Sequence, residues 1–510
     1  MDKRIRRIGI FLVLCFAALF VQLNNIQVVR ASSLANNPNN PQILEAQRNQ
    51  PRGDIISADG VTLASSVPTT SGFYKYRRVY NPYTASLFAQ IVGFDSNYYG
   101  NNYGVEAEYN RFLTSHTRAP KTLRDLLVNR TGADNVTLTV SAKLQAQVAA
   151  AINQLAPGVV GAAAVVLNPA TGAIEAMYAN PTFDPNPLVS TNIATERSAY
   201  ASLIKVPGSP LLGGAYGQVY PPGSSFKVVT VSAVLQDRPD LAAATYPTIP
   251  FIPLPDTGNP PQVLTNYASL PCPIGAGTLE NLFIQSCDAN FANIGRKLGA
   301  QTLVNEAQLY GFNGKVPVDL PSYTVATSNF GSVASFGVTA PNAVGVPGLM
   351  KSAIGQENVN ASALQMAMAA GTVANGGVEM TPHVMSQIRD SQGRLVEAYQ
   401  PKAWRVPISP QTASTITTFM QGVTANPLGT AAGIFPPSWH VAAKTGTAQV
   451  GSFGPHPKYT TDWLVAFAQV GSAKAAIAVV LPNEPGSATG AGYSAPIVKM
   501  ILGDMLANQS

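Results

Sequence analysis

Three short segments of this chain carry residue types suited to nucleophilic catalysis, and long stretches of unrelated sequence separate them. The segments are Ser224-Ser225-Phe226-Lys227, Ser286-Cys287-Asp288 and Lys444-Thr445-Gly446-Thr447. A serine hydroxyl is a weak nucleophile unless a base lies beside it, and a lysine can serve as that base. One segment alone would mean little, but all three in this order predict a serine acyl-transfer site.

Ser224 is the predicted nucleophile and Lys227 is its predicted base. Proline and glycine at 221–223 end the preceding element, and an apolar helix is predicted over Ser225–Gln236. Ser224 should lie at or near a helix N-terminus, where unpaired backbone N–H groups favour negative charge. Lys227 shares its helix face. It can accept a proton only if burial and a nearby cation, for which Lys444 is the candidate, keep it neutral part of the time.

A second Ser-x-x-Lys sequence, Ser202-Leu203-Ile204-Lys205, competes with this assignment. It is followed at once by Val206-Pro207-Gly208, and proline cannot continue a helix interior. The copy at Ser224, which opens an apolar helix, is therefore the better candidate.

The Ser286-Cys287-Asp288 segment is predicted to be a loop between helices at Leu279–Ile284 and Ala289–Leu298. The Ser286 hydroxyl could relay a proton to a leaving amine, and Asp288 could hold Lys227 and a substrate amide. The alternative is a helix cap, since serine and aspartate favour that position. The two companion segments favour the catalytic interpretation.

The Lys444–Thr447 segment lies in a predicted strand over Ala442–Val450. Gly446 would let a substrate backbone approach closely, and an extended peptide could add to the strand edge. Lys444, Thr445 and Thr447 would hold a terminal carboxylate, and the N–H groups of Ser224 and Thr447 would form an oxyanion hole. The alternative is an edge strand with an unrelated lysine.

Other site types have little support. The net charge is +6 and no basic stripe with interleaved aromatics is present, so no nucleic-acid partner is expected. No phosphate-binding or dinucleotide motif indicates a cofactor. No metal site is expected either, because the histidines lack metal-ligand spacing; they are His116, His383, His440 and His456.

The N-terminal segment 1–30 predicts membrane targeting. Basic residues from Lys3 to Arg7 precede an apolar run over Ile8–Val21, which extends with polar interruptions to Val29. The basic flank should stay in the cytoplasm and place the body outside. An uncleaved membrane-spanning anchor is preferred; the alternative is a signal peptide cleaved near Ser33-Leu34-Ala35.

The rest of the chain predicts two folded parts of α+β class. Residues 31–140 begin with a linker and include a hairpin at Asp59-Gly60. Residues 141–510 should form a central antiparallel sheet whose strands come from both ends of that part. The predicted elements are a helix at Ala142–Leu155, strands at Gly161–Leu167, Ala173–Tyr178, Ala442–Val450, Trp463–Val470 and Ala475–Leu481, and helices at Ala363–Ala374 and Ser494–Leu506.

Cysteine usage leaves one question open. Cys15 lies in the apolar run, and Cys272 and Cys287 lie in the body. An exported body would permit these two to pair, but two buried free thiols are an equal alternative.

The chain resembles the class B penicillin-binding proteins, of the actinobacterial penicillin-binding protein A type, over nearly its whole length. Beyond the three segments, the matching positions are Arg52-Gly53 with Asp59-Gly60, Gly104-Val105-Glu106 with Tyr109, Asn168–Gly172, Pro181–Asn186, Ile354-Gly355-Gln356, Leu364–Gly377 and Trp463. Two positions depart from the family pattern. Asp288 stands where most members have asparagine, and Gly213-Gly214 stands where many have Asn-Arg.

The resemblance implies a membrane anchor, a non-catalytic pedestal (dimerisation-type) domain and a serine β-lactamase/transpeptidase-like domain with an all-helical subdomain. It implies a peptidoglycan D,D-transpeptidase, a β-lactam target, that cross-links stem peptides through an acyl-enzyme on Ser224. It also implies a membrane-embedded SEDS glycan polymerase as partner. A role in cell division or in cell elongation is left open.

Three rival functions have less support in the sequence. A D,D-carboxypeptidase or β-lactamase on the same scaffold would need a water-activating base, and no glutamate can be assigned to that role. A β-lactam receptor would need cytoplasmic signalling mass, and about seven residues precede the apolar run. A catalytically silent cell-wall scaffold would be expected to have lost one of the motif lysines, and both are present.

Overall fold

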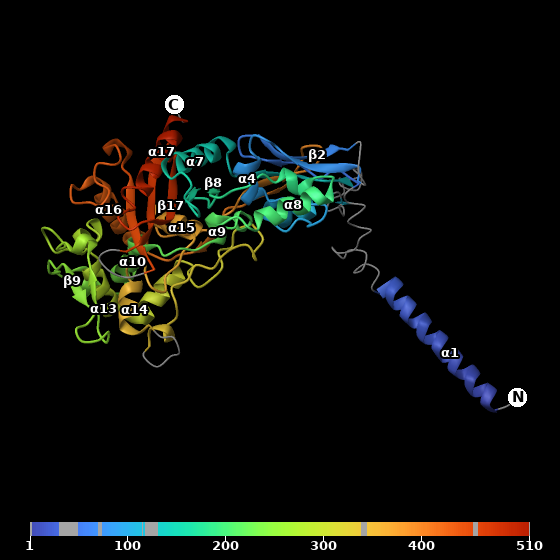
Figure 1. Ribbon diagram of the computed structural model, residues 1–510, viewed down its shortest axis with the longest axis horizontal. Helices are drawn as coiled ribbons and strands as arrows, with labels where there is room; N and C mark the ends of the chain where they lie inside the picture. Colours follow the sequence, from blue (N-terminus) through green and yellow to red (C-terminus); the bar gives the residue numbers. More distant parts are fainter. Residues whose placement is uncertain are drawn as a thin grey trace.

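An isolated N-terminal helix stands away from an elongated body (Figure 1). The computed structural model describes residues 3–29, 49–69, 74–114, 116–117, 131–337, 344–451 and 457–508. The isolated helix, α1 (Lys3–Asn24), continues into a π-helical turn over Asn25–Val29. Within the described part of the chain, the span Arg6–Gln27 is the one helix long and apolar enough to cross a membrane. Its 22 residues would reach about 33 Å, close to the thickness of a bilayer core.

A five-stranded antiparallel sheet forms the centre of the body, in the order β15-β16-β17-β7-β8. Its strands are β7 (Ala163–Leu167), β8 (Ile174–Ala179), β15 (Ala442–Val450), β16 (Tyr459–Val470) and β17 (Ala473–Pro485). β17 pairs with β7, so strands from both ends of the segment after residue 141 meet in one sheet, as predicted. β16 begins four residues before the predicted start at Trp463.

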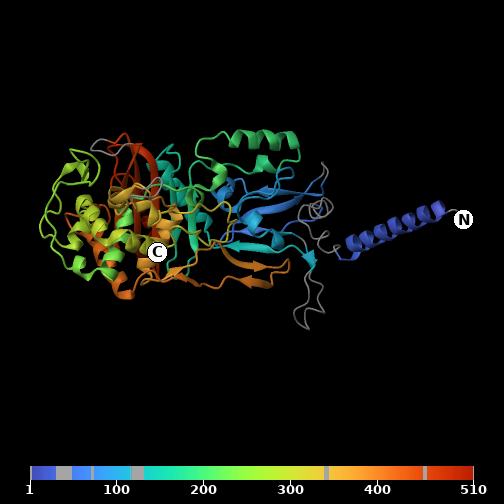
Figure 2. The same cartoon turned by 90° about the horizontal axis from the view of Figure 1, so that it is seen from below.

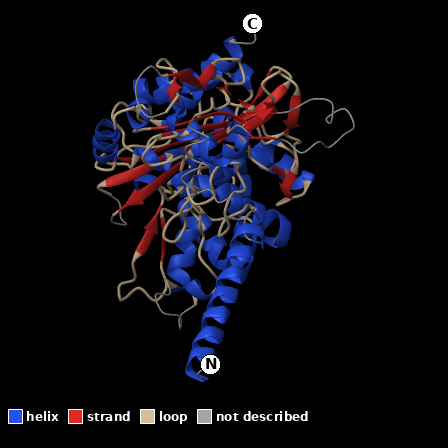
Figure 3. Cartoon of the chain, turned by 90° about the vertical axis from the view of Figure 1, so that its right-hand side faces the viewer, coloured by secondary structure: helices blue, strands red, loops and turns tan. Residues whose placement is uncertain are grey.

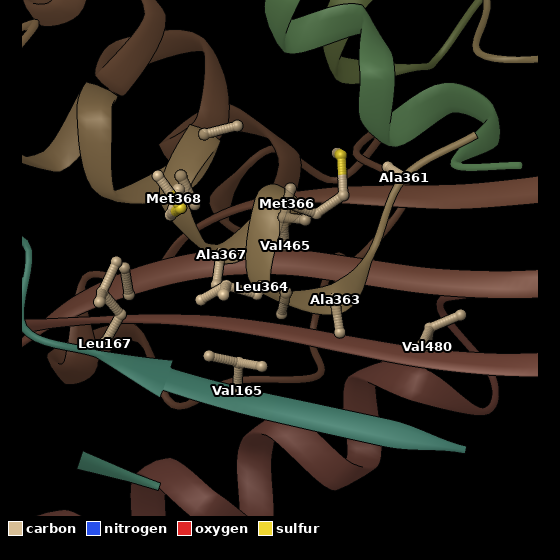
Figure 4. Close-up of a cluster of buried hydrophobic side chains, with 14 of the residues drawn as sticks. Val165, Leu167, Ala361, Ala363, Leu364, Met366, Ala367, Met368, Val465 and Val480 are labelled. Atoms are coloured by element: carbon tan, nitrogen blue, oxygen red, sulfur yellow. The ribbon is translucent and has the colours of Figure 1, made fainter. Parts of the chain in front are cut away.

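Helices cover both faces of this sheet, as Figure 3 shows. α7 (Ala142–Leu155) and α17 (Ser494–Ala507) pack together on one face, where their apolar side chains join those of the strands. α15 (Ala363–Ala374) covers the other face, and all its residues are buried. Figure 4 shows its Leu364 packed against the strands near Val165.

Serine side chains fix where two of these helices begin. Ser141 Oγ accepts the backbone N–H of Leu144 at the start of α7, and Ser362 Oγ accepts that of Gln365 at the start of α15. Such caps satisfy donors that the first helical turn leaves open. α7, α15 and β15 have the bounds that the sequence predicted.

Most of the remaining helices lie beside β15, an edge strand of the sheet. α16 contacts β15, and α10 contacts both α13 and α16. The major elements are α10 (Lys227–Asp237), α12 (Leu279–Ile284), α13 (Asp288–Leu309), α14 (Gly345–Ser352) and α16 (Pro410–Ala425). Smaller ones are α9 (Gly214–Gly217), α11 (Pro239–Ala242), β9 (Phe251–Pro253), β10 (Val263–Thr265), β11 (Glu379–Met380) and β14 (Ala403–Arg405). This group corresponds to the expected helical subdomain. α8 (Ile193–Leu203) lies apart from it, and its Tyr200 stacks on Tyr99.

A six-stranded sheet lies at the end of the body nearer to α1 (Figures 1 and 2), in the order β13-β12-β6-β1-β2-β3. Its strands are β1 (Ile55–Ile56), β2 (Thr62–Pro68), β3 (Tyr76–Tyr80), β6 (Asn135–Leu138), β12 (Met385–Arg389) and β13 (Leu395–Ala398). Beside it lie α4 (Ala85–Val92), α5 (Gly104–Glu108), α6 (Asn110–Leu113) and the short pair β4 (His116–Thr117) and β5 (Thr131–Gly132). β12 and β13 come from after α15, which the sequence did not predict.

Buried charge and a capping carboxylate hold this second sheet in place. Glu106 is fully buried and accepts from Arg52 Nη2 at 2.7 Å and from Arg78 Nε at 2.5 Å. Asp59, in the predicted hairpin turn, accepts the backbone N–H groups of Ala142 and Lys143. The hairpin therefore caps α7 and ties the second sheet to the helix that covers the central one.

Candidate active site

Ser224 lies in a 3₁₀ turn, Gly223–Phe226, that leads directly into α10. This is the predicted position near a helix N-terminus. Gly223 has a φ of 53°, and a Cβ atom there would come within 2.7 Å of the Thr447 carbonyl carbon. Because only glycine tolerates both conditions, the turn can lie directly against β15. Two of the three predicted segments therefore meet.

Lys227 is fully buried at the start of α10, and its ammonium reaches the second segment. Nζ donates to Asp288 Oδ1 at 2.6 Å, to the Ser286 carbonyl at 2.9 Å and to Ser286 Oγ at 3.1 Å. Burial lowers the pKa of Lys227, while the Asp288 carboxylate acts to raise it. The lowered pKa favours a neutral fraction at physiological pH, which a base requires.

The Ser224 hydroxyl donates to Asp288 Oδ1 at 3.1 Å, the same oxygen that accepts from Lys227. Among the hydrogen bonds of the described residues, none joins Ser224 Oγ to Lys227 directly. In the structure Asp288 therefore contacts Lys227, as predicted. It also contacts the nucleophile Ser224, which was not predicted. Asp288 begins α13 instead of lying in a loop, so it also occupies a helix N-terminus.

Ser286 lies between the two lysines. Its φ of 62° is in the left-handed region, and Lys444 Nζ donates to its Oγ at 2.8 Å. Lys227 Nζ donates to the same oxygen at 3.1 Å. When the hydroxyl accepts from both lysines, its own proton stays available for donation. This geometry suits the predicted proton relay.

Lys444 is as deeply buried as Lys227. Burial lowers its pKa well below the ordinary value, the charge of Lys227 lowers it further, and Asp288 opposes both. The sequence assigned Lys444 as the cation that lowers the pKa of Lys227. In the structure, burial is the main cause of that shift, and the charge of Lys227 also acts to lower the pKa of Lys444.

The remainder of the third segment lies along β15. Thr445 Oγ1 and Thr430 Oγ1 share a hydrogen bond of 2.7 Å, and Thr447 Oγ1 accepts the N–H of Gly490 at 3.2 Å. A Cβ atom on Gly446 would come within 2.5 Å of the Pro222 carbonyl oxygen. Gly446 is therefore needed to let the Ser224 turn pack on the strand, in addition to any role toward substrate.

A disulfide between Cys272 and Cys287 adjoins the site, which answers the question that the sequence left open. Cys287 stands between Ser286 and Asp288, and both half-cystines are buried. Asn266 Oδ1 accepts the backbone N–H of Ala289 at 2.9 Å. The disulfide and this hydrogen bond hold the 266–272 segment against the start of α13, beside Asp288.

The rejected candidates lie elsewhere. Ser202 is exposed on α8 and donates to the Ser198 carbonyl. His383 stacks on Tyr399, and burial lowers its pKa to about 4. Within the described ranges no group of three or more histidine, cysteine or acidic residues could hold a metal ion. His456 lies outside those ranges.

Two residues near the third segment were missed by the sequence analysis. Thr430 contacts Thr445, and Asp462 lies opposite Thr447 in the β15–β16 pairing. No local signal marks Thr430. The aromatic and β-branched run Tyr459-Thr460-Thr461 favours a strand and could have extended the prediction to include Asp462.

Comparisons with known proteins agree with this geometry. The penicillin binding protein transpeptidase domain family matches residues 162–503, and the penicillin binding protein A dimerisation domain family matches residues 52–140. The chain is 32% identical over 510 residues to the peptidoglycan D,D-transpeptidase PbpA of Mycolicibacterium smegmatis, covering 98% of this chain and 97% of that protein. It is 32% identical over 518 residues to PbpA of Mycobacterium tuberculosis, covering 98% of each.

Solved structures of penicillin-binding protein A from M. tuberculosis are similar in fold. Its ceftriaxone acyl-enzyme complex superimposes with a TM-score of 0.78 at 30% identity, covering 90% of this chain and 99% of that chain. Its penicillin G acyl-enzyme complex gives 0.77 at 31% identity, covering 90% and 100%. By sequence and by fold, this chain belongs to the family of the penicillin-binding protein transpeptidases.

Proposed function

We propose that this protein is a peptidoglycan D,D-transpeptidase that acts through an acyl-enzyme on Ser224. The observation that carries the proposal is one connected set of hydrogen bonds, which joins Ser224, Lys227, Ser286, Asp288 and Lys444. Its relatives are named as peptidoglycan D,D-transpeptidases, and penicillin-binding protein A of M. tuberculosis forms acyl-enzymes with β-lactams. Both findings support an enzyme with a covalent intermediate that β-lactams trap.

In the first step, Ser224 Oγ attacks the carbonyl carbon between the two D-alanines of a stem peptide. A C–O bond forms while the hydroxyl proton passes to the neutral fraction of Lys227. The backbone N–H groups of Ser224 and Thr447 hold the oxyanion, and one such donor is worth about 10²–10³ in rate. The C–N bond then breaks. Ser286 gives its proton to the departing D-alanine amine and takes one back from a lysine.

In the second step, an amine of a neighbouring stem peptide attacks the ester carbonyl. A new C–N bond forms, the bond to Ser224 Oγ breaks, and the amine proton returns to Ser224 through the same lysine and serine groups. The products are a cross-link and the free hydroxyl. A D,D-carboxypeptidase or β-lactamase would use water in place of the amine.

The donor peptide is expected to bind along β15. This strand is an edge of its sheet, so its outer backbone groups can pair with an extended peptide. Thr445, Gly446 and Thr447 lie on that edge beside Lys444. The hydroxyls of Thr445 and Thr447, together with the lysine, supply donors for the terminal carboxylate.

We also infer that α1 is an uncleaved anchor, with the body on the outer side of the cell membrane. Its apolar side chains are exposed, and basic residues precede them. We divide the chain into an anchor (1–30), a pedestal (31–140) and a transpeptidase domain (141–510), of which β12 and β13 join the pedestal sheet. A membrane-embedded SEDS polymerase is the proposed partner, and co-purification from detergent-solubilised membranes, with and without residues 1–30, would test it.

The intact mass of the detergent-solubilised protein after incubation with penicillin G tests the proposal. A stable increase of one drug mass is expected on the parent and on Ser202→Ala, a matched serine outside the site, but not on Ser224→Ala. An adduct on Ser224→Ala would refute the nucleophile. No adduct with consumed drug would indicate a hydrolase, and no adduct with intact drug would indicate a silent scaffold.

A further inference from the structure

A buried carboxyl group adjoins the third segment but takes no part in the mechanism above. Asp462 lies on β16 directly opposite Thr447 of β15, and none of its surface is exposed. Directly opposed residues of an antiparallel pair project from the same face of the sheet, with Cβ atoms about 4.5–5.5 Å apart. Neither carboxyl oxygen of Asp462 accepts a hydrogen bond of good geometry, although the hydroxyls of Thr460 and Thr447 lie near enough to act on its pKa. A buried carboxyl without a well-formed hydrogen bond, beside a substrate-binding threonine, requires an explanation.

The segment before α17 encloses this carboxyl. Ser494 Oγ donates to the Asp462 backbone carbonyl at 3.0 Å, and Gly490 N–H donates to Thr447 Oγ1 at 3.2 Å. Residues 486–494 of that segment carry no charged side chain. Solvent is therefore kept from Asp462 by neutral groups.

One charged group faces Asp462 among the described residues packed around it. Glu484 of β17 lies opposite Thr460, two residues before Asp462 on the same face. Lys444 is three residues before Thr447 on β15, so its side chain projects from the opposite face. Burial, with a contribution from the charge of Glu484, raises the pKa of Asp462 to about 7, and the hydroxyls of Thr460 and Thr447 act in the opposite direction. Burial also raises the pKa of Glu484.

The hydroxyl of Thr447 has one proton, and Gly490 already donates to its oxygen. If Asp462 is ionised, that proton is attracted to Asp462, and the charge also repels an incoming carboxylate. If Asp462 is protonated, the repulsion disappears and the Thr447 proton is free for the substrate. Because of both effects, the enzyme with protonated Asp462 binds the carboxylate of the donor peptide more tightly.

We propose that Asp462 is a positioning residue whose protonation decides whether Thr447 can donate its hydroxyl to the substrate carboxylate. The proposal rests on the proposed function, because Thr447 binds that carboxylate there. Its consequence is that the rate of acylation falls as pH rises through neutrality. This fall is separate from the increase in rate that deprotonation of Lys227 produces. Since one hydrogen bond to a charged group is at stake, the loss should be about tenfold or more.

The second-order rate constant for acylation by penicillin G, measured from pH 5 to pH 9 on the full-length protein, tests this. The parent should lose rate with a midpoint near 7, the pKa of Asp462. Asp462→Asn, which keeps the shape of the side chain, should lack this decline. It should keep the acid limb of the profile, which is the rise in rate at low pH as Lys227 loses its proton. Asp504→Asn on α17, the same chemical change at a part-exposed position, should keep the decline.

Glu484→Gln supplies an independent arm. Without the neighbouring carboxylate the pKa of Asp462 falls, so the decline should move to lower pH. A structural role for Asp462 would not shift a midpoint. The inference is overturned if Asp462→Asn keeps the parent's decline, or if Glu484→Gln leaves the midpoint in place. Acylation of Ser224→Ala would overturn the proposed function, whereas a parent that acylates without any decline would overturn the role of Asp462 alone.

Discussion

Asp288→Asn is the substitution that most directly tests the hydrogen-bond cluster around Ser224. In the parent, Asp288 Oδ1 accepts from Lys227 Nζ at 2.6 Å and from Ser224 Oγ at 3.1 Å. The carboxylate acts to raise the pKa of Lys227 against the effect of burial. An asparagine oxygen can still accept from the lysine but without the charge, so the pKa of Lys227 should fall further.

The expected size of this effect follows from the loss of one neighbouring charge, because the lysine ammonium keeps a hydrogen bond to the asparagine oxygen. An opposite charge within about 4–6 Å shifts a pKa by about 1–3 units, and Asp288 Oδ1 lies 2.6 Å from Lys227 Nζ. One unit corresponds to about 1.4 kcal/mol. The acid limb of penicillin acylation should therefore move down by at least about one unit in Asp288→Asn, as stopped-flow measurements from pH 5 to pH 9 would show.

A matched control is Asp240→Asn. Asp240 forms an exposed ion pair with Arg238 at 2.7 Å, so the same chemical change there should leave the profile in place. If Asp288→Asn gives the parent's profile and rate, Asp288 does not act on Lys227 and its assignment to the site is wrong. A shift of the acid limb toward higher pH would refute the electrostatic argument itself.

Four other perturbations have defined outcomes. Lys444→Ala should move the acid limb of the first-order acylation step, measured at saturating penicillin, to higher pH, opposite to Asp288→Asn, because in the drug complex loss of the Lys444 charge raises the pKa of Lys227. Reduction of the Cys272–Cys287 disulfide, whose half-cystines are 15 residues apart, should lower the free energy of unfolding by about 3 kcal/mol in urea titrations; a Cys272→Ala/Cys287→Ala variant should not respond to the reductant. Glu106→Gln should cost about 3–5 kcal/mol at pH 7, because it leaves Arg52 and Arg78 buried without their carboxylate. Burial acts to raise the pKa of Glu106, but the two arginines outweigh it, and the pKa is lowered from its ordinary value of 4.5. The loss of unfolding free energy in the variant should therefore be complete above pH 4.5 and shrink as pH falls through the pKa of Glu106 in the folded protein. Gly446→Ala should slow acylation about a hundredfold by displacing the Ser224 turn from β15, whereas Gly314→Ala, with its nearest neighbour at 3.5 Å, should not.

The sequence predicted the features that depend on residues close together along the chain, such as single helices and the short catalytic segments. α7 and α15 were placed correctly because each combines a serine cap with a long apolar pattern. The three catalytic segments were found because each is a short pattern of adjacent residues. The predicted helix after Asp288 was too short, because Gly299, with a φ of 81°, marks a kink after which α13 continues to Leu309.

Relations between distant residues were the part that sequence could not supply. The pairing of β12 with β6 depends on contacts over more than 200 residues, and no local pattern encodes it. The bond from Ser224 to Asp288 depends on how two helix starts face each other. Asp462 became visible only through its cross-strand register with Thr447.

The charges of the site also reconcile the expected role of Lys444 with the observed one. Two buried lysines share one carboxylate, so the cluster does not favour two ammonium groups at once. With no substrate bound, the ammonium of Lys227 forms the ion pair with Asp288. Lys444 has no such ion pair among the described residues, and its pKa lies well below the ordinary value. A carboxylate bound beside Thr445 and Thr447 would stabilise the charge on Lys444. The repulsion would then act on Lys227 and favour its neutral form. The predicted influence of Lys444 on the base therefore belongs to the substrate complex, where the proton of Ser224 must be accepted.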